Sequence, residues 1–591
     1  MLKKRLFIIM VLIFIAILFA VCNNGGDTSG PETTEPETPN PETPPHDPSL
    51  NNFTAAPALS LTAGDCSLGY TWTDSDPAAD SYDLYYAEGN GLAAETIKAG
   101  TKIAGTISGS TINTLKNNTT YSVLVTANKA GYNSINSSVK TETTNESGST
   151  VWARSVSTAD NKSIFYAVAV DNSGNVYAAG KQIGKGSFTY GTGVSVSATG
   201  DNNSGDNVIL VKYNSEGTAQ WARSISAGPA GFTVFFGVAV DASGNIYAAG
   251  AQSRYSYTYG PGVSAIGSGS ENAVLVKYNS SGTAQWARSI GSDGGYARFY
   301  GVAVDNFGNV YAAGYQTGAG AYAGNNAILV KYDSEGTVQW KQSTTTAKND
   351  SVFKGVAVGA SGVYAVGYQT GSSDFSYGNG TLTAGSSSVG DNAVRVWYDS
   401  EGKTLYAQSV IGSPLSTFNA VAVYVSSIYA AGYQYGNGGF TPNTGITVWG
   451  GSSGSNAVLL KDGRWARSVN PSNASTSFYG VAVDASGNIY AAGAQGGGNN
   501  IYSYYGGIYI TGGAHSGATL VKYDSEGTAQ WVRFVNAADN SSVFNAVAVD
   551  TSGVYAVGYQ NGSGSFSYGS GVSVAGAYND GENAVLVKYQ K

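Results

Sequence analysis

One short apolar motif returns seven times in the C-terminal three-quarters of this 591-residue chain. Each copy is followed by a turn and an apolar strand, then by a variable loop, a third strand, a second turn and a fourth strand, as residues 238–289 show. Four strands repeated seven times predict an all-β fold, a seven-bladed β-propeller. The Val-Ala-Val motif begins at Val168, Val238, Val302, Val356, Val421, Val481 and Val547.

The two ends of the repeated region, residues 151–591, carry complementary fragments of one repeat. Val151–Ser155 has the sequence of a fourth strand with no three strands before it, and Ala584–Tyr589 is a third strand with no fourth. We therefore expect the strand at 151–156 to complete the last blade. Closure of this kind leaves no unpaired strand edge at the seam of the ring.

The repeat unit Val-Ala-Val-Asp-x-Ser-Gly-Asn, continued by Ile/Val-Tyr-Ala-Ala-Gly, resembles the SBBP repeat of bacterial propellers and, more distantly, the NHL repeat. The resemblance extends over residues 151–591. It implies the propeller fold but no particular activity, because one fold carries many functions.

The amino terminus has the sequence of an export signal. Lys3, Lys4 and Arg5 precede an uninterrupted apolar run over 6–21, and Cys22 follows it. Residues 1–22 resemble a bacterial lipoprotein signal peptide, which implies that Cys22 is acylated and that a lipid anchor is the chain's contact with the membrane. The resemblance implies an exported protein on the outer membrane or the cell surface. The alternatives are an uncleaved anchor or an ordinary signal peptide with a chance Cys.

Residues 23–52 are rich in Pro, Glu and Thr and have no apolar periodicity, so we expect a disordered stalk. Residues 53–146 then show alternating strands at 66–72, 82–86 and 119–127. The spacing Leu115-x-x-x-Thr119-x-Tyr121 resembles the tyrosine corner of fibronectin type III domains. The resemblance implies a small N-terminal β-sandwich that acts as a spacer.

Composition excludes several classes of function. The net charge of −8 argues against a nucleic-acid partner, because no basic stripe is present to neutralise phosphates. With two Cys and two His in the chain, a disulfide framework is excluded and we expect neither a Cys/His metal site nor another cofactor. His515 stands alone in the repeats without a nucleophile motif, so we do not expect an enzyme. Asp171 and its counterparts begin Ser-Gly turns, where Asp most simply binds its own backbone.

A Gln follows the second strand of every repeat, and we take these residues as candidates for a ligand face. They would lie on the face that carries the long variable loops. Two interpretations stay open: the amides tie each blade to neighbouring backbone, or they surround a polar ligand in the central funnel. The residues are Gln182, Gln252, Gln316, Gln369, Gln434, Gln495 and Gln560.

The variable loops repeat an aromatic pattern, Phe/Tyr-x-Tyr-Gly, that predicts small hairpins. Aromatic side chains beside Asn and Gly suit sugar- or protein-binding surfaces, but they could equally pack beneath their own hairpin. The third repeat has a much shorter loop, at 318–326, and should leave a notch. The candidate ligand-face tyrosines are Tyr190, Tyr259, Tyr377, Tyr504 and Tyr568.

The fourth strands carry a Trp in six repeats, and Tyr406 replaces it in the remaining one. We expect these rings to serve packing between blades. The sequence thus predicts a lipid-anchored envelope protein that binds a glycan or protein ligand through the loop-rich face of its propeller. A structural scaffold of the envelope is the alternative. A propeller hydrolase or lyase is a third possibility, which carboxylates meeting in the central funnel would favour.

Overall fold

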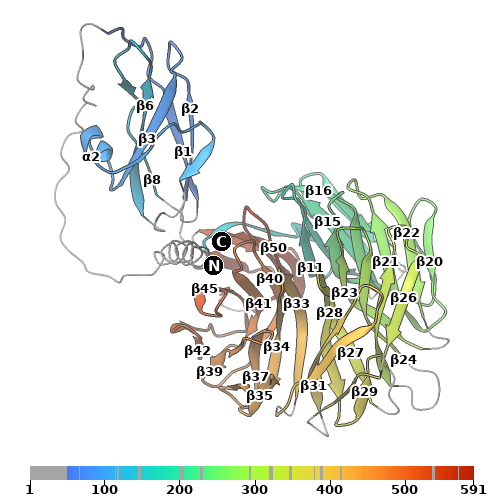
Figure 1. Ribbon diagram of the computed structural model, residues 1–591. Coiled ribbons are helices and arrows are strands. Elements are labelled where there is room, and N and C mark those ends of the chain that lie inside the picture. The colour runs from blue at the N-terminus through green and yellow to red at the C-terminus, as the bar shows by residue number, and fades with distance from the viewer. Residues whose placement is uncertain are drawn as a thin grey trace, which may run out of the picture. The chain divides into compact units, whose positions relative to one another are not determined.

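The structure is a computed structural model that divides into two compact units, residues 1–149 with 590 and residues 150–589 with 591 (Figure 1). The predicted signal peptide with Cys22, and all but the last three residues of the predicted stalk, lie outside the described residues. In the part of the chain that is described, we find no helix with the length and apolar character needed to cross a membrane. The structure describes residues 50–591 except 65–66, 113–114, 116–118, 144–147, 199–204, 226–230, 292–294, 318–323, 345–348, 379, 386–389, 413–414, 444, 536–539 and 570.

The smaller unit consists of two antiparallel sheets that share one core. Leu68, Tyr70 and Trp72 alternate on a strand as the sequence predicts, and all three are buried. They pack with Leu84 and with Tyr121 of the other sheet. One sheet holds β1 (Ala58–Gly64), β2 (Ser67–Thr73) and β5 (Ser110–Ile112). The other holds β4 (Thr101–Ile103), β3 (Ser81–Glu88), β6 (Thr120–Asn128), β7 (Ile135–Asn136) and β8 (Lys140–Thr143), with the short helix α2 (Ala94–Lys98) beside it.

The larger unit contains seven four-stranded antiparallel sheets, one for each repeat, which we number 1 to 7. Sheets 1 to 3 are β11 (Ser163–Val170), β12 (Val176–Ile183), β15 (Asp206–Tyr213) and β16 (Ala219–Ser224); β17 (Thr233–Val240), β18 (Ile246–Ser253), β21 (Glu271–Tyr278) and β22 (Ala284–Ile290); and β23 (Ala297–Val304), β24 (Val310–Thr317), β25 (Asn325–Tyr332) and β26 (Val338–Ser343). Sheets 4 and 5 are β27 (Ser351–Gly359), β28 (Gly362–Thr370), β31 (Asp391–Tyr398) and β32 (Thr404–Ser409); and β33 (Ser416–Tyr424), β34 (Ser427–Tyr435), β37 (Ser455–Lys461) and β38 (Trp465–Ser468).

Sheets 6 and 7 complete the set, and sheet 7 is built from both ends of the repeated region. Sheet 6 is β40 (Thr476–Val483), β41 (Ile489–Gln495), β44 (Gly517–Tyr523) and β45 (Ala529–Phe534). Sheet 7 is β46 (Ser542–Val549), β47 (Val554–Asn561), β50 (Glu582–Tyr589) and β9 (Thr150–Ser155), and β9 pairs with β50. The first strand of each sheet contacts the first strand of the next, and β11 contacts β46, so the contacts return to their starting point.

Most sheets carry a small hairpin between the second and third strands, as the aromatic pattern predicts. Sheet 3 has none among its described residues. The hairpins are β13 (Gly186–Gly191) with β14 (Val194–Ala198), β19 (Ser256–Gly260) with β20 (Val263–Ile266), β29 (Asp374–Ser376) with β30 (Leu382–Ala384), β35 (Gly439–Asn443) with β36 (Ile446–Trp449), β42 (Ile501–Tyr504) with β43 (Ile508–Thr511) and β48 (Ser565–Gly569) with β49 (Val572–Ala575). The two-residue strands β10 (Thr158–Ala159) and β39 (Asn470–Pro471) pair with β13 and β42.

A β-bulge interrupts the first strand of every sheet at the same place. In sheet 2 the register shifts between Phe235 and Gly237, so Phe236 has no partner on β18. The bulge brings the carbonyl of Val234 against Gly250, where a Cβ atom would lie 1.8 Å from the carbonyl oxygen. Only glycine fits at this position, which explains why the second strand of each repeat carries one there.

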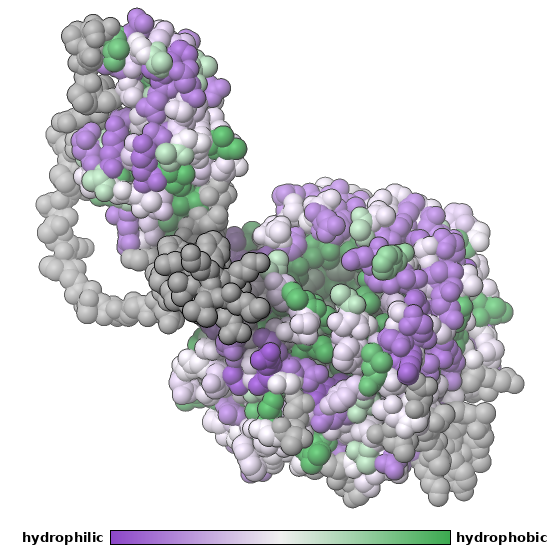
Figure 2. All heavy atoms as spheres, viewed as in Figure 1, coloured by the Kyte–Doolittle hydropathy of each residue, from purple (hydrophilic) through white to green (hydrophobic). Residues whose placement is uncertain are grey.

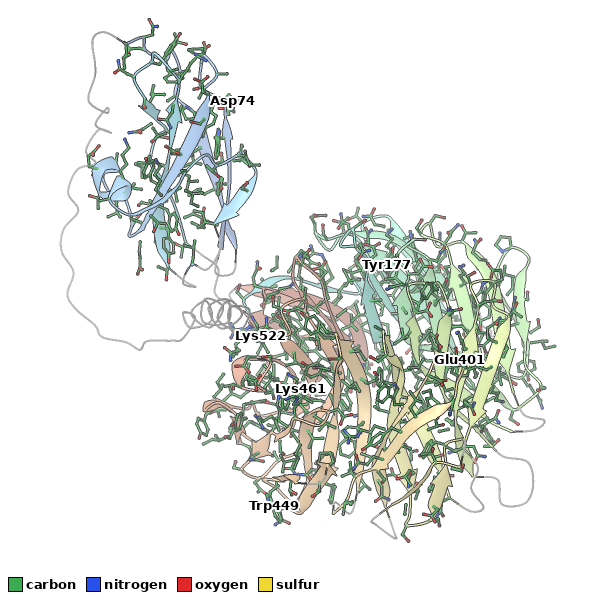
Figure 3. The ribbon with its side chains drawn as sticks, viewed as in Figure 1. Asp74, Tyr177, Glu401, Trp449, Lys461 and Lys522 are labelled. Atoms are coloured by element: carbon green, nitrogen blue, oxygen red, sulfur yellow. The ribbon has the colours of Figure 1, made fainter. Side chains whose placement is uncertain are left out.

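At four of the contacts between consecutive sheets, a Lys, a Trp and an Arg of one sheet donate to a turn of the next sheet. Between sheets 2 and 3, Lys277 Nζ and Trp286 Nε1 each donate to the carbonyl of Ser334 at 3.0 Å, and Arg288 Nε donates to the carbonyl of Gly336 at 2.8 Å. Gly336 has φ +79°, and a Cβ atom there would lie 2.9 Å from the Trp286 ring. We call this set of donors and its turn the clamp. Figure 3 marks one of its lysines, Lys461, on the third strand of sheet 5, where it donates to the carbonyl of Ser525.

The Trp–Ser bond of the clamp recurs around the set of sheets. It joins Trp152 to Ser215, Trp221 to Ser280, Trp286 to Ser334, Trp340 to Ser400 and Trp465 to Ser525. The first of these bonds runs from β9 of sheet 7 to sheet 1. The expectation that the Trp rings serve packing between sheets is therefore confirmed for these five, and each ring also donates a hydrogen bond to the backbone of the next sheet.

The contact between sheets 4 and 5 departs from this pattern on both sides at once, and we call it the seam. Sheet 4 carries Trp397, Tyr406 and Gln408 at the positions of the Lys, Trp and Arg donors, whereas the other sheets keep all three donors except sheet 3, which has Gln342 at the Arg position. Sheet 5 lacks the Ser-Glu-Gly turn and passes from β37 to β38 through Asp462 and Gly463. The seam has therefore lost both the donor side chains of sheet 4 and the acceptor turn of sheet 5.

The interior of the seam shows the same coupling. At every other contact, a Leu of one third strand packs with a Tyr that ends the third strand of the next sheet, as Leu275 does with Tyr332. At the seam Arg395 replaces the Leu and Asp462 replaces the Tyr. Arg395 Nη1 lies 2.5 Å from Asp462 Oδ1, and its Nη2 donates to the carbonyl of Pro442 at 3.0 Å. An ion pair therefore stands where apolar side chains pack elsewhere.

A double-mutant cycle tests this coupling. Arg395→Leu leaves the Asp462 carboxylate without its partner and should lower the free energy of unfolding by about 2–4 kcal/mol. Arg395→Leu combined with Asp462→Tyr installs the pair used at the other contacts and should recover most of that loss. Urea titration of the full chain measures both, with Lys162→Met, which breaks the more exposed pair with Glu582, as the control. Strict additivity of the two substitutions would contradict the coupling.

Candidate functional site

The candidate glutamines are buried, and most are bonded to the candidate tyrosines. Each of five Tyr hydroxyls donates to the Oε1 atom of the Gln in its own sheet. The donor–acceptor distances are 3.3 Å for Tyr190 and Gln182, 2.8 Å for Tyr259 and Gln252, 3.0 Å for Tyr377 and Gln369, 2.9 Å for Tyr504 and Gln495, and 2.7 Å for Tyr568 and Gln560. All ten side chains are buried, with at most 5% of any residue exposed.

The other end of the amide fixes the hairpin. Gln252 Nε2 donates to the carbonyl of Ala265 on β20 at 3.1 Å, and Gln369 Nε2 donates to that of Thr383 at 3.0 Å. Each Gln–Tyr pair therefore holds a hairpin against its own sheet. The prediction that these residues form a ligand face is wrong for the ten paired residues, because burial removes them from any ligand. The alternative of an amide that binds backbone holds for Gln252, Gln369 and Gln560, but within one sheet and not between blades.

The two remaining glutamines sit where the pair is incomplete. Gln316 belongs to sheet 3, is half-buried, and accepts a hydrogen bond from Lys341 Nζ at 2.5 Å. Gln434 belongs to sheet 5, where Pro442 occupies the Tyr position. It is fully buried, and among the described residues neither amide atom has a hydrogen-bond partner. Gln434 is therefore closed to any ligand, and Gln316 alone cannot form the predicted ring of amides.

These two environments of one residue type give a matched test. Gln252→Leu removes both amide bonds and leaves the Tyr259 hydroxyl buried without an acceptor, so the free energy of unfolding should fall by about 1–3 kcal/mol. Gln434→Leu removes an amide that bonds nothing in the described protein and should cost less than about 0.5 kcal/mol or stabilise. Urea unfolding of the two variants decides this, and equal losses would refute the structural role.

The side chains that line the inner edge of the sheets come from the bulges. The residue after the Phe of each first strand contacts its counterparts on neighbouring first strands. Ring centroids of Tyr166 and Phe236 lie 5.4 Å apart, those of Phe236 and Tyr300 lie 5.3 Å apart, and Lys354 Nζ lies 4.0 Å from the centroid of Tyr300. We call these the axial residues: Tyr166, Phe236, Tyr300, Lys354, Asn419, Tyr479 and Asn545.

Charge gathers at sheets 2 to 4 of this axial surface. Arg298 forms a bidentate pair with the buried Glu271, with one bond through Nε and a second from Nη2 to Oε2 at 3.0 Å. Its guanidinium carbon lies 5.8 Å from the ring of Phe236. Burial and the Arg298 charge lower the pKa of Lys354 to about 8. A lysine that half-titrates near neutral pH, set among aromatic rings, is a common feature of functional sites.

Second-strand tyrosines complete the arrangement. Tyr315 and Tyr368 directly precede Gln316 and Gln369, and they therefore point to the opposite face of the strand from those glutamines. The ring centroids of Tyr300 and Tyr315 lie 6.1 Å apart, and Lys354 Nζ lies 5.9 Å from the ring centroid of Tyr368. Burial raises the pKa of Tyr315 to about 12. We call Arg298, Tyr300, Tyr315, Lys354 and Tyr368 the axial cluster; all five are half-buried.

A carboxylate also belongs to this environment. Asp391 accepts a hydrogen bond from Thr370 Oγ1 at 2.9 Å. Burial raises its pKa, the Asp350 charge raises it further, and Lys354 acts in the opposite direction. The cluster thus combines a guanidinium, an ammonium, a carboxylate and several aromatic faces. Such a set can bind a polar molecule by stacking and by hydrogen bonds to hydroxyl or carboxylate groups.

The sequence analysis did not identify the axial residues, because it selected positions that hold the same residue type in every repeat. The Gln position is invariant, whereas the axial position reads Tyr, Phe, Tyr, Lys, Asn, Tyr and Asn along the chain. Variation among otherwise regular repeats was the available signal. The short loop of the third repeat was noticed, and sheet 3 is the sheet that supplies Arg298, Tyr300 and Tyr315.

The remaining residues that the sequence analysis considered for catalysis or metal binding form no such site among the described residues. Asp171 Oδ1 accepts bonds from the backbone N–H groups of Ser173 and Asn175, both at 2.9 Å, which fits the turn interpretation. His515 is exposed. Within the described ranges, no group of three or more His, Cys, Asp or Glu side chains is arranged to hold a metal ion.

Comparison with known proteins adds little to this geometry. No family model and no curated protein matches the chain. Among solved structures, the Bacillus licheniformis rhamnogalacturonan lyase PL11 is similar over 92% of this chain and 91% of its own, at 12% sequence identity and a TM-score of 0.23. A similarity this low supports no conclusion about fold or activity.

Proposed function

We propose that the larger unit is a closed seven-bladed β-propeller that binds a glycan through its axial cluster. Closure is supported by the cyclic contacts of the first strands and by the pairing of β9 with β50. The observation that carries the binding proposal is the half-buried group of Lys354, Arg298 and three tyrosine rings at one side of the axis. Aromatic faces stack on the C–H faces of sugar rings, and the charged groups bond hydroxyls.

The remaining parts fit an exported binding protein. We propose that residues 1–22 form a lipoprotein signal with Cys22 as the acylated residue, that 23–52 form a stalk, and that 53–146 form a fibronectin type III-like spacer. The chain would then present the propeller outside the cell or at the outer membrane. The two sheets of the smaller unit with buried Tyr121 support the spacer assignment.

A glycan array probed with the full chain tests the main proposal. We expect a specific set of glycans to bind, and Tyr300→Ala and Lys354→Met each to weaken binding about 10-fold, the size of a moderate hot spot. Phe307→Ala, which removes a 90% exposed ring from a turn of sheet 3, is the control and should change nothing. An array with no bound glycan would favour the scaffold alternative, whereas axial variants that bind as the unaltered chain does would exclude the axial cluster as the glycan site.

The pH dependence of binding gives a second test. The pKa of Lys354 is lowered to about 8, whereas an unperturbed lysine keeps its charge to about pH 10. The ammonium that donates to the ligand is therefore present below pH 8 and is lost as the pH rises through that value. Affinity measured by calorimetry should fall between pH 7 and 9, and Lys354→Met should be weak and flat over this range. A flat profile for the unaltered chain would exclude Lys354 as a contact.

A hydrolase or lyase is the second candidate, favoured by the neighbourhood of Lys354, Tyr300 and Asp391. A lysine of lowered pKa can remove a proton, and a carboxyl of raised pKa can supply one. The binding experiment separates the two candidates, because an enzyme would release shortened products from a bound glycan over time. Release that is lost in Lys354→Met would establish the catalytic alternative.

A further inference from the structure

The seven repeats provide an internal control for what the fold requires. Where most repeats fill a position with one residue type or with side chains smaller than Trp, packing or turn geometry explains them, and a large aromatic or charged side chain found there in one repeat needs another explanation. Three such departures occur in the hairpins and outer strands of sheets 5 and 6. They meet at one groove of about 560 Å³, which we call the rim groove.

The first departure is Trp449 at the end of β36. Its position in the other hairpins holds Ser197, Ile266, Ala384, Thr511 and Ala575. Trp449 is 66% exposed and projects at the edge of the larger unit (Figure 3). An indole with most of its surface in water contributes little to folding, so its presence favours a ligand or partner.

The second departure is Tyr505, which directly follows β42. Four other hairpins hold glycine here: Gly191, Gly260, Gly378 and Gly569. Tyr505 is 53% exposed, and its ring lies 3.8 Å from the guanidinium carbon of Arg467. Arg467 is itself fixed by the clamp, since its Nη2 donates to the carbonyl of Glu526 at 2.8 Å. The guanidinium thus holds the Tyr505 ring in place while about half of the residue stays exposed.

The third departure is Arg464, the residue before the Trp of the fourth strand. Four of the other repeats hold glutamine there: Gln220, Gln285, Gln339 and Gln530. Arg464 is exposed, and its side chain forms no hydrogen bond or ion pair among the described residues. Arg464 lines the groove together with Trp449, Tyr505 and Arg467, and the lining also includes Asn470 and Ser503.

The groove is lined by positive charge, whereas the chain as a whole carries negative charge. The described residues that line it include two arginines and no carboxylate, in a protein of net charge −8. Figure 2 shows polar residues over much of the visible face of the larger unit, with apolar residues scattered among them. Two aromatic platforms with a free guanidinium between sheets 5 and 6 match the chemistry of an acidic sugar, whose ring stacks and whose carboxylate or sulfate takes a bidentate Arg.

We propose that the rim groove is a binding site for an anionic polysaccharide, with Trp449 and Tyr505 as stacking surfaces and Arg464 as the contact to the acidic group. The site is separate from the axial cluster and does not depend on it. Because its three distinguishing residues depart from the repeat, replacing each by the residue of the other repeats should remove the site without disturbing the sheets.

The test uses the full chain and affinity electrophoresis in gels that contain alginate, polygalacturonate, chondroitin sulfate, dextran or mannan. We expect retardation by at least one acidic polymer and by neither dextran nor mannan. Trp449→Ala, Tyr505→Gly and Arg464→Gln should each weaken that binding about 10-fold. Ile266→Ala alters the matching hairpin position of sheet 2, 70% exposed, and should leave binding unchanged.

The same gels distinguish this site from the axial one. Lys354→Met should keep its retardation by the acidic polymer if the rim groove binds, whatever happens on the glycan array. Retardation by neutral polymers alone, no retardation by any polymer, or consensus variants that bind as the unaltered chain does would each overturn the proposal. Retained urea midpoints for the three variants show that a loss of binding is not a loss of fold.

Discussion

The larger unit depends on the clamp, in which Lys, Trp and Arg of one sheet hold a turn of the next. The three donors satisfy backbone carbonyls that the outer turn would otherwise leave to solvent. The indole packs against a glycine of the turn, where the positive φ and the close approach of the ring both exclude a side chain. Each contact that carries the clamp orients one sheet against the next. The bonds from Trp152 to Ser215 and from Arg154 to Gly217 tie β9 back to sheet 1.

The exceptions to the clamp follow from the same geometry. At the seam, loss of the turn in sheet 5 coincides with loss of the three donors in sheet 4, and the Arg395–Asp462 pair takes over the contact. At sheet 7 the turn is replaced by the two chain ends, and Trp531 Nε1 is buried without a partner in the described protein. At the seam the donors and the turn have changed together, whereas sheet 6 keeps Lys522, Trp531 and Arg533 although sheet 7 has no such turn, and the buried Trp531 N–H is left unpaired.

The positions that could carry function are those the clamp, the bulge and the Gln–Tyr pair leave free. The axial residues are among these positions because the bulge leaves them without a partner on the second strand of their own sheet, at the inner edge where they contact neighbouring first strands. The fold does not require Trp449, Tyr505 or Arg464, because other repeats form the same hairpin and outer strand with different residues at these positions. Invariance among the repeats therefore reports folding, and positions that vary without replacing a contact between sheets report the surfaces available for binding.

The sequence by itself determined the number of sheets, the four strands of each, the hairpins and the assignment of strand 151–156 to the last sheet, because these follow from period-2 alternation, turn residues and counting. It also predicted burial of Leu68, Tyr70 and Trp72 from alternation alone. Only the tertiary structure decided which residues face the axis. The bulge adds one unpaired residue after each Phe, so alternation cannot be carried through it, and the glutamines meet their tyrosines only when a distant hairpin folds back over the sheet. Tyr315 and Gln316 are neighbours in the chain, yet a strand points them to opposite faces, and the sequence could not say which face would be open.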